Sequence, residues 1–111
     1  MILREKDRLA LVDIFSTLFI PVEVWAYGSR VNGSAHDGSD LDLVIRDKEL
    51  KGLPIEIYTH LVETIKNSNI PILVELRDWN HLPKNFHDQI VLQYEVLFDS
   101  EWNSSSSSRP L

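Results

Sequence analysis

The residues best suited to do chemistry in this chain are two aspartates, Asp40 and Asp42, at the start of a hydrophobic run. Apolar side chains alternate with and follow them through Ile45, a pattern typical of a β-strand. Side chains two apart in a strand point to the same face, so both carboxylates are expected in one cleft. Such oxygens suit Mg²⁺, and two ions roughly 4 Å apart can share a carboxylate. The pattern therefore predicts a divalent-metal site of the kind used in phosphoryl or nucleotidyl transfer.

A Gly-Ser pair, Gly28-Ser29, precedes Asp40 by ten intervening residues and follows a predicted strand at 22–27. Gly28 allows a sharp turn and a close approach of the backbone to a phosphate, because it has no Cβ. Ser29 can add its hydroxyl, and the N–H groups of a short helix starting near Arg30 would face an anion. Arg30 is itself a candidate for direct contact with phosphate oxygens.

Three other interpretations of this segment compete with a phosphate site. An EF-hand loop counted from Asp37 fails, because Leu41 and Asp42 stand where a carboxylate and a glycine are required. Gly28 and Gly33 have the glycine spacing of a P-loop, but Ser34-Ala35 follows where Lys-Ser/Thr is required. A plain polar turn is the third alternative. It leaves Asp42 unexplained, because an aspartate inside a hydrophobic strand is disfavoured and is costly to bury without a partner.

The pattern Gly-Ser-x10-Asp-x-Asp resembles the signature of the DNA polymerase β-like nucleotidyltransferase superfamily. A chain this short is similar to the minimal nucleotidyltransferases of that superfamily, often called MNT proteins. Family members carry a third catalytic carboxylate on a later strand, usually an Asp within a hydrophobic run. Here Glu75 falls in the matching place within the run 70–79. This is a departure by one methylene, and it bears on metal geometry and on activity.

Glu75 also stands out without the family pattern. It follows apolar positions in a predicted interior strand, where a carboxylate is as anomalous as Asp42. A strand-end residue that reaches solvent is the alternative, and it stays open at this point. Asp78 is the rival third acid, but it lies past the strand beside Trp79 and is expected in a loop. We therefore favour Glu75.

The resemblance implies an α+β fold of the polymerase β-like type. In this fold a small mixed sheet has helices packed on one face and the active site on the other. It also implies a Mg²⁺-dependent transfer of a nucleoside monophosphate to a hydroxyl acceptor, with AMP from ATP as the favoured case. In that scheme the catalytic residues, which also hold two Mg²⁺ ions, are Asp40, Asp42 and Glu75, and the nucleotide-binding residues are Gly28, Ser29 and Arg30.

The resemblance implies a partner as well. Minimal nucleotidyltransferases are paired with a small helical HEPN-domain RNase toxin and act as antitoxins by modifying a tyrosine on it. A small-molecule hydroxyl, as in aminoglycoside-modifying relatives, is an alternative acceptor. A second alternative is a non-catalytic binding antitoxin of the same fold. The glutamate at position 75 supports that alternative, and the intact Asp-x-Asp opposes it, because carboxylates that cost free energy to bury would be lost from a decayed site.

The composition of the chain restricts the classes of molecule that it can bind. The 111 residues carry 11 Lys and Arg against 17 Asp and Glu, a net charge of −6, without a basic stripe for long nucleic acid. A nucleotide stays compatible with this charge because Mg²⁺ brings the positive charge. The lack of cysteine excludes disulfides and thiolate zinc sites and fits a cytoplasmic location. No apolar stretch nears the roughly 18–20 residues of a membrane span, and self-association stays open.

Hydrophobic periodicity predicts the elements that position these residues. We expect one nucleotidyltransferase domain over residues 1–102 and a Ser-rich, disordered tail over 103–111. The predicted helices lie at 5–19, 55–67 and 84–94, and the predicted strands at 22–27, 40–45, 70–79 and 96–98.

Overall fold

The chain folds into a four-stranded sheet with helices on both sides. The structure, a computed structural model, describes residues 1–33 and 38–102, and the tail predicted at 103–111 lies outside them. The helices are α1 (Glu5–Ser16), α2 (Ser29–Asn32), α3 (Ile55–Lys66), the 3-10 turn η1 (Trp79–His81) and α4 (Lys84–Leu92). The strands are β1 (Val22–Tyr27), β2 (Leu41–Asp47), β3 (Val74–Asp78) and β4 (Tyr94–Asp99).

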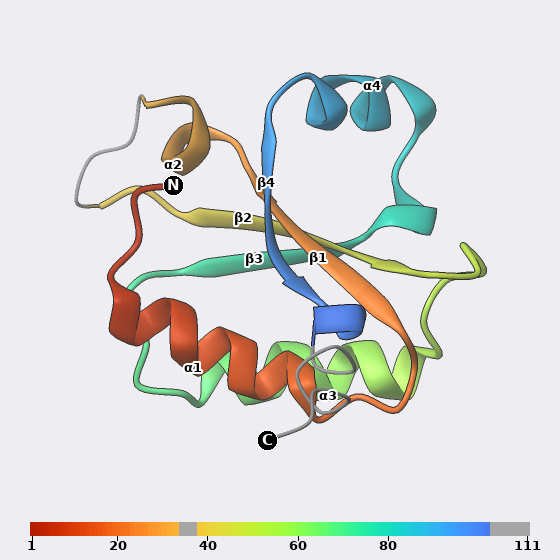
Figure 1. Ribbon diagram of the computed structural model, residues 1–111, viewed down its shortest axis with the longest axis horizontal. Helices are drawn as coiled ribbons and strands as arrows, with labels where there is room; N and C mark the ends of the chain where they lie inside the picture. The colour runs from red at the N-terminus through yellow and green to blue at the C-terminus, as the bar shows by residue number, and fades with distance from the viewer. Residues whose placement is uncertain (34–37, 103–111) are drawn as a thin grey trace, which may run out of the picture.

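The strand order is β3-β2-β1-β4 (Figure 1). Strand β1 runs antiparallel to both β2 and β4, whereas β2 and β3 are parallel. A parallel pair requires a crossover connection, and α3 supplies it between β2 and β3. The mixed sheet confirms the predicted α+β class.

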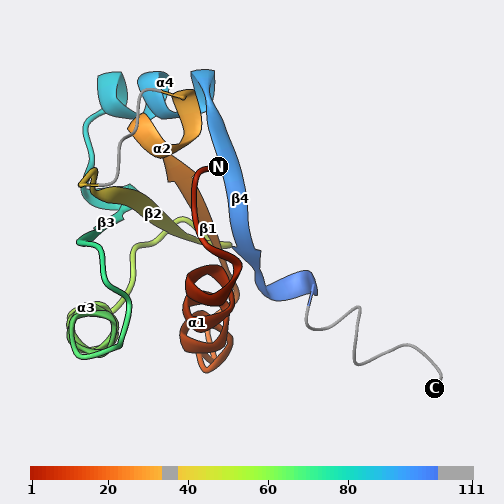
Figure 2. The ribbon, with the colours of Figure 1, turned by 90° about the vertical axis from the view of Figure 1, so that its left-hand side faces the viewer.

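One face of the sheet packs against α1 and α3. Alternate strand residues supply this layer, with Val24 and Ala26 from β1 and Leu43 and Ile45 from β2 fully buried. Figures 1 and 2 show both helices on the same side of the strands. Removing this apolar surface from water, at about 25 cal/mol per Å², is the main force that holds the sheet to these helices.

The second face of the sheet is covered in part by α4. Trp25, Tyr27 and Val44 form a separate apolar cluster there with Ile90 of α4. We predicted that the helices share the first face, and α4 departs from that prediction. The physical reason is that these strand residues also need cover from water. In Figures 1 and 2, α4 lies across the strands from α1 and α3.

Most elements lie where the sequence predicts them, and their ends differ by a few residues. The first strand has the predicted bounds, whereas the first helix ends at Ser16 and leaves Phe19 beyond it fully exposed. The third strand begins at Val74 instead of residue 70. The last strand already begins at Tyr94, because its residues pair with β1 from that point. Within the described ranges, no helix is long and apolar enough to cross a membrane.

Candidate active site

The parallel pairing of β2 and β3 brings two of the predicted carboxylates together. Asp42 and Glu75 are direct partners in the register, so their side chains emerge side by side on the second face of the sheet. Asp40 precedes the first residue of β2 and acts on the charge of Asp42. Residues that are far apart in the sequence therefore meet at one end of two neighbouring strands.

The Gly-Ser turn lies directly against Asp42. Gly28 has φ 80° and ψ −154°, a conformation that side chains rarely adopt. A Cβ placed on it would lie 2.6 Å from Oδ2 of Asp42, which is closer than any real contact. Position 28 thus needs glycine both for its backbone conformation and for the space it leaves to Asp42. The turn then enters α2, where the Gly28 carbonyl accepts from Val31 and Asn32 at 3.0 Å.

Arg77 joins the site, and our sequence analysis missed it. Its Nη1 donates to the Tyr27 hydroxyl at 3.1 Å and to Oδ1 of Asp42 at 3.5 Å. Its Nη2 lies 3.8 Å from Oε2 of Glu75. The signal that could have found it is its place two residues after Glu75, which puts both side chains on the same face of a strand.

Burial and charge shift the acid–base behaviour of these groups. Burial raises the pKa of Asp42, the charge and hydrogen bond of Arg77 pull it back down, and the nearby Asp40 and Glu75 add to the rise. Burial likewise raises the pKa of Tyr27, against the opposing effect of Arg77. The site therefore gathers negative charge beyond what Arg77 offsets, and a cation there is favoured.

The donor set fits Mg²⁺ chemically, since Asp40, Asp42 and Glu75 offer only carboxylate oxygens. Within residues 1–33 and 38–102, no three acidic or histidine side chains are already gathered around one point in the manner of a metal centre. Arg77 holds oxygens of Asp42 and Glu75 instead. A divalent ion on these carboxylates would compete with Arg77 for the same oxygens.

Arg30 lies differently from our prediction. Its side chain is buried, and its guanidinium donates to the carbonyl of Ile2 at 2.7 Å and to that of Ser39 at 2.9 and 3.1 Å. We predicted a phosphate contact, and these bonds direct the group to backbone carbonyls instead. Arg30 thus ties the N-terminal segment to Ser39, the residue before Asp40.

Asp78, the rival third acid, serves the fold. It is buried, and its two oxygens accept from the backbone N–H groups of Leu53 and Asn80 at 2.9 and 3.0 Å. Side chains alternate between the two faces along a strand, so Asp78, an odd number of residues after Glu75 in β3, points to the opposite face of the sheet. The structure places Glu75, and not Asp78, beside Asp42.

Known proteins are similar to this chain in sequence and in fold. The family described as "Polymerase beta, Nucleotidyltransferase" matches residues 10–103. The chain is also similar to the probable protein adenylyltransferase MntA of Haemophilus influenzae. The two are 34% identical over 100 residues, which cover 87% of this chain and 84% of that relative.

Two solved structures are similar in fold. A toxin–antitoxin structure with AMP-PNP has a TM-score of 0.67 at 17% identity and covers 92% of this chain and 79% of that one. A tri-AMPylated Shewanella oneidensis HEPN toxin in complex with an MNT antitoxin matches with a TM-score of 0.64 at 13% identity, over 93% of this chain and 78% of that one. At these identities the likeness concerns the fold alone.

Proposed function

The chain belongs to the polymerase beta nucleotidyltransferase family, and from that premise we propose that it moves AMP from Mg·ATP to a hydroxyl on a protein. The observation that carries the proposal is the pairing of Asp42 with Glu75 across β2 and β3, directly against the Gly28 turn. This arrangement puts two hard oxygen ligands next to a backbone that a phosphate can approach closely.

Asp40, Asp42 and Glu75 are the residues that would hold Mg²⁺. When bound, Mg²⁺ supplies positive charge against the phosphate oxygens and helps to orient the triphosphate. Gly28 exposes its backbone to the phosphates, and Ser29 adds a hydroxyl beside them. Arg77 contributes a second positive charge at the same place, which favours a bound phosphate further.

The transfer forms a bond from the acceptor hydroxyl oxygen to the α-phosphorus. The bond from that phosphorus to the oxygen bridging to the β-phosphate breaks, and pyrophosphate leaves. Glu75, whose side chain is 44% exposed, takes the proton of the hydroxyl as general base. Asp42, whose side chain is only 28% exposed, acts as a Mg²⁺ ligand and not as the base.

We assign the acceptor to a tyrosine of a HEPN-domain RNase toxin, so that this chain acts as its antitoxin. The similarity to a protein named as an adenylyltransferase supports the reaction. The likeness in fold to an MNT antitoxin, solved with a tri-AMPylated HEPN toxin, supports the partner. The net charge of −6 fits an acceptor on a protein better than one on a long nucleic acid.

The test combines the purified chain, ATP labelled on the α-phosphate, Mg²⁺ and a purified HEPN-domain partner. We expect label on the partner, located on a tyrosine by mass spectrometry. The Asp40→Ala, Asp42→Ala double variant should give none. Asp13→Asn, which changes an exposed carboxylate on α1, is the matched control and should transfer label like the wild type.

Two other outcomes of this experiment would support the alternative functions instead. Mg²⁺-dependent consumption of ATP without a labelled protein would move the acceptor to a small-molecule hydroxyl. A stable complex with the partner and no consumption of ATP would establish a non-catalytic binding antitoxin. In that case Glu75→Asp is the first variant to make, because it restores the family's usual residue.

A further inference from the structure

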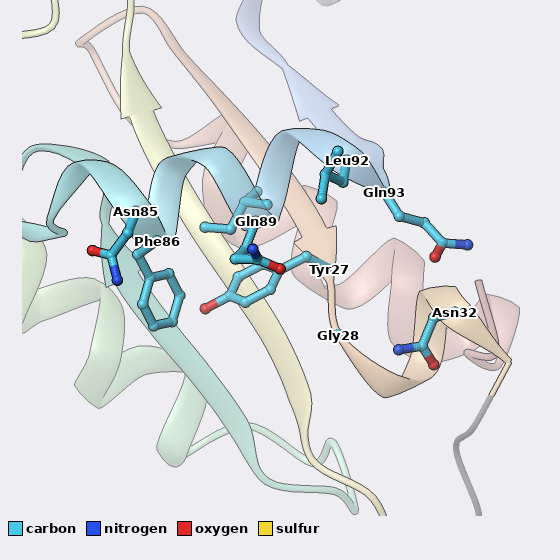
Figure 3. A pocket seen from close by; sticks show the side chains of 9 residues that line it. Tyr27, Gly28, Asn32, Asn85, Phe86, Gln89, Leu92 and Gln93 are labelled. Atoms are coloured by element: carbon cyan, nitrogen blue, oxygen red, sulfur yellow. The ribbon is translucent and has the colours of Figure 1, made fainter.

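A cavity of about 520 Å³ opens beside the Gly28 turn. Tyr27 and Ile90 line it, together with Asn32 of α2 and further residues of α4. In Figure 3, Phe86 and Gln89 extend from α4 on the side of Tyr27, and Asn32 stands on α2 at the opposite rim. This volume is within the range of roughly 300–1,000 Å³ that is typical of small-molecule sites.

The lining has a distinctive chemistry. Of the nine lining residues none is charged, and four carry a primary carboxamide: Asn32, Asn85, Gln89 and Gln93. A carboxamide donates and accepts hydrogen bonds at the same time, so it complements a neutral group with both kinds of atoms on one edge. The aromatic rings of Tyr27 and Phe86 offer faces for stacking. A phosphate or a carboxylate would find no cation among these nine residues.

The cavity is continuous with the phosphate position of the proposed function. Gly28 lines the cavity, and the same residue lies against the Asp42 carboxylate. The side of Glu75 must stay open for the acceptor hydroxyl in the proposed function. A triphosphate held at Gly28 and Asp42 can instead extend its nucleoside into the cavity that Gly28 lines.

We propose that this cavity takes the base and ribose of the nucleoside triphosphate, and that Gln89 and Asn85 select adenine. The proposal rests on the proposed function, since it assigns the other half of the same substrate. Asn and Gln side chains pair with the N6 amino group and N7 of adenine through two hydrogen bonds, and guanine presents a different pattern of donors and acceptors on that edge. Stacking on Phe86 or Tyr27 adds affinity that does not depend on the base.

Equilibrium binding separates the two halves of the substrate. Isothermal titration calorimetry with Mg²⁺ would compare ATP, GTP and inorganic tripolyphosphate on the wild type, Gln89→Leu and Asn85→Leu. We expect each variant to lose about tenfold in ATP affinity and most of the preference for ATP over GTP, with tripolyphosphate binding unchanged. Both amides are exposed on α4, so the variants should keep the wild-type melting temperature. Asn69→Leu, which changes an exposed amide in the loop between α3 and β3, is the control and should bind all three like the wild type.

The remaining outcomes overturn the proposal in distinguishable ways. If tripolyphosphate binds and the variants keep the wild-type preference among nucleotides, the cavity does not hold the base, while the phosphate site of the proposed function stands. If the variants leave ATP binding unchanged and weaken only the binding of the protein acceptor, the cavity belongs to the acceptor. If the wild type binds neither ATP nor tripolyphosphate, both this proposal and the proposed function are wrong.

Discussion

Two arginines on neighbouring strands of the same sheet face have opposite surroundings. At the carboxylate end of the second face, Arg77 of β3 lies among acidic and hydroxyl groups: Asp42, Glu75 and Tyr27. At the tryptophan end, Arg46 of β2 packs against two indole rings, 4.4 Å from the ring centroid of Trp25 and 4.5 Å from that of Trp79. The guanidinium is the same in both places, and the groups that hold it differ.

The difference separates a stabilising contact from a contact that a ligand can replace. Packing against the two rings leaves the side chain of Arg46 20% exposed, and within the described residues its buried Nε has no hydrogen-bond partner. Its Nη1 forms an ion pair with Oε2 of Glu23 at 3.4 Å. The side chain of Arg77 is 37% exposed, and its partners are the oxygens that a metal ion or a phosphate would compete for. One end of the face stabilises the fold, and the other is kept for chemistry.

The largest expected effect comes from a single oxygen at the carboxylate end. Asp42→Asn should lower AMP transfer about 10³-fold, because a neutral amide is a poor Mg²⁺ ligand and several kcal/mol of charge stabilisation are lost. The same change at Asp78 should leave transfer within a fewfold and lower the melting temperature instead, because that carboxylate accepts two backbone N–H groups. Label transfer and thermal melts on both variants measure this. Equal loss of transfer in the two variants would contradict the assignment of Asp42.

The second effect tests the space between Gly28 and Asp42. Gly28→Ala should lower transfer about 10²-fold, because the new Cβ must push the Asp42 carboxylate from a position 2.6 Å away. Gly33→Ala is a matched control, since Gly33 also has a positive φ, 86°, but has nothing within 4 Å of its Cβ position. Both variants should lose about 1–3 kcal/mol of stability from backbone strain. Only Gly28→Ala should lose the activity, and similar transfer rates in the two variants would remove Gly28 from the site.

The two arginines are compared by the same substitution. Arg77→Met should lower transfer about tenfold, because a charged hydrogen-bond donor to the phosphate region is lost. Its effect on the free energy of unfolding should stay within about 1 kcal/mol, because its ion pairs are partly exposed. Steady-state transfer rates and urea unfolding give both numbers. A large loss of stability without loss of transfer would make Arg77 a structural residue like Arg46.

Arg46→Met, at the tryptophan end, is expected to lower the stability of the fold and to leave AMP transfer unchanged. Each cation–π contact contributes about 0.5–1 kcal/mol, so losing two should lower the free energy of unfolding by about 1–2 kcal/mol. Transfer should remain at the wild-type level at a temperature where the variant is folded. Urea unfolding followed by tryptophan fluorescence suits this variant, because Trp25 and Trp79 report on the same place. A fall in transfer by the folded variant would show that the two ends of the face are coupled.

How much of this could be predicted from the sequence depends on whether a feature is local. The alternation of apolar residues around Asp42 fixes the face of its side chain, and the strand at 22–27 was predicted with the bounds that β1 has. Which strand pairs with a given strand in the sheet is not determined by the local sequence. That Asp42 lies opposite Glu75 depends on the crossover through α3, which no period in either strand encodes.

The differences between the prediction and the structure have the same origin. Arg30 follows a Gly-Ser pair, which suggested a phosphate ligand, but the fold brings the carbonyls of Ile2 and Ser39 around its guanidinium. Arg77 was overlooked because its role depends on the residue across the sheet, Asp42 on β2. The period of α4 predicts a helix with one apolar side, but that period does not say which face of the sheet the helix covers.

The smallest expected effect concerns the proton affinity of Asp42 in the metal-free protein. Burial raises its pKa in the folded state and Arg77 lowers it, so Arg77→Met should raise it further. Arg46→Met should move it less, because Arg46 is held at the tryptophan end. Titration of the Asp42 carboxyl carbon by NMR measures the pKa in each variant, and a fall in the Arg77→Met variant would contradict the electrostatic role of Arg77.

The same shift fixes the sign of a stability effect. A carboxyl whose folded-state pKa lies above its unfolded value contributes stability at pH below the unfolded pKa, and this contribution is lost as the pH rises through the folded pKa. At neutral pH the ionised Asp42 therefore destabilises the metal-free fold, and Asp42→Asn should melt no lower than the wild type there. Mg²⁺ should raise the melting temperature of the wild type more than that of Asp42→Asn, because the ion binds the ionised carboxylate of the folded state. The charge of Asp42 therefore destabilises the fold until a cation binds it, whereas Arg46 at the tryptophan end already packs against two rings and pairs with Glu23 in the metal-free protein.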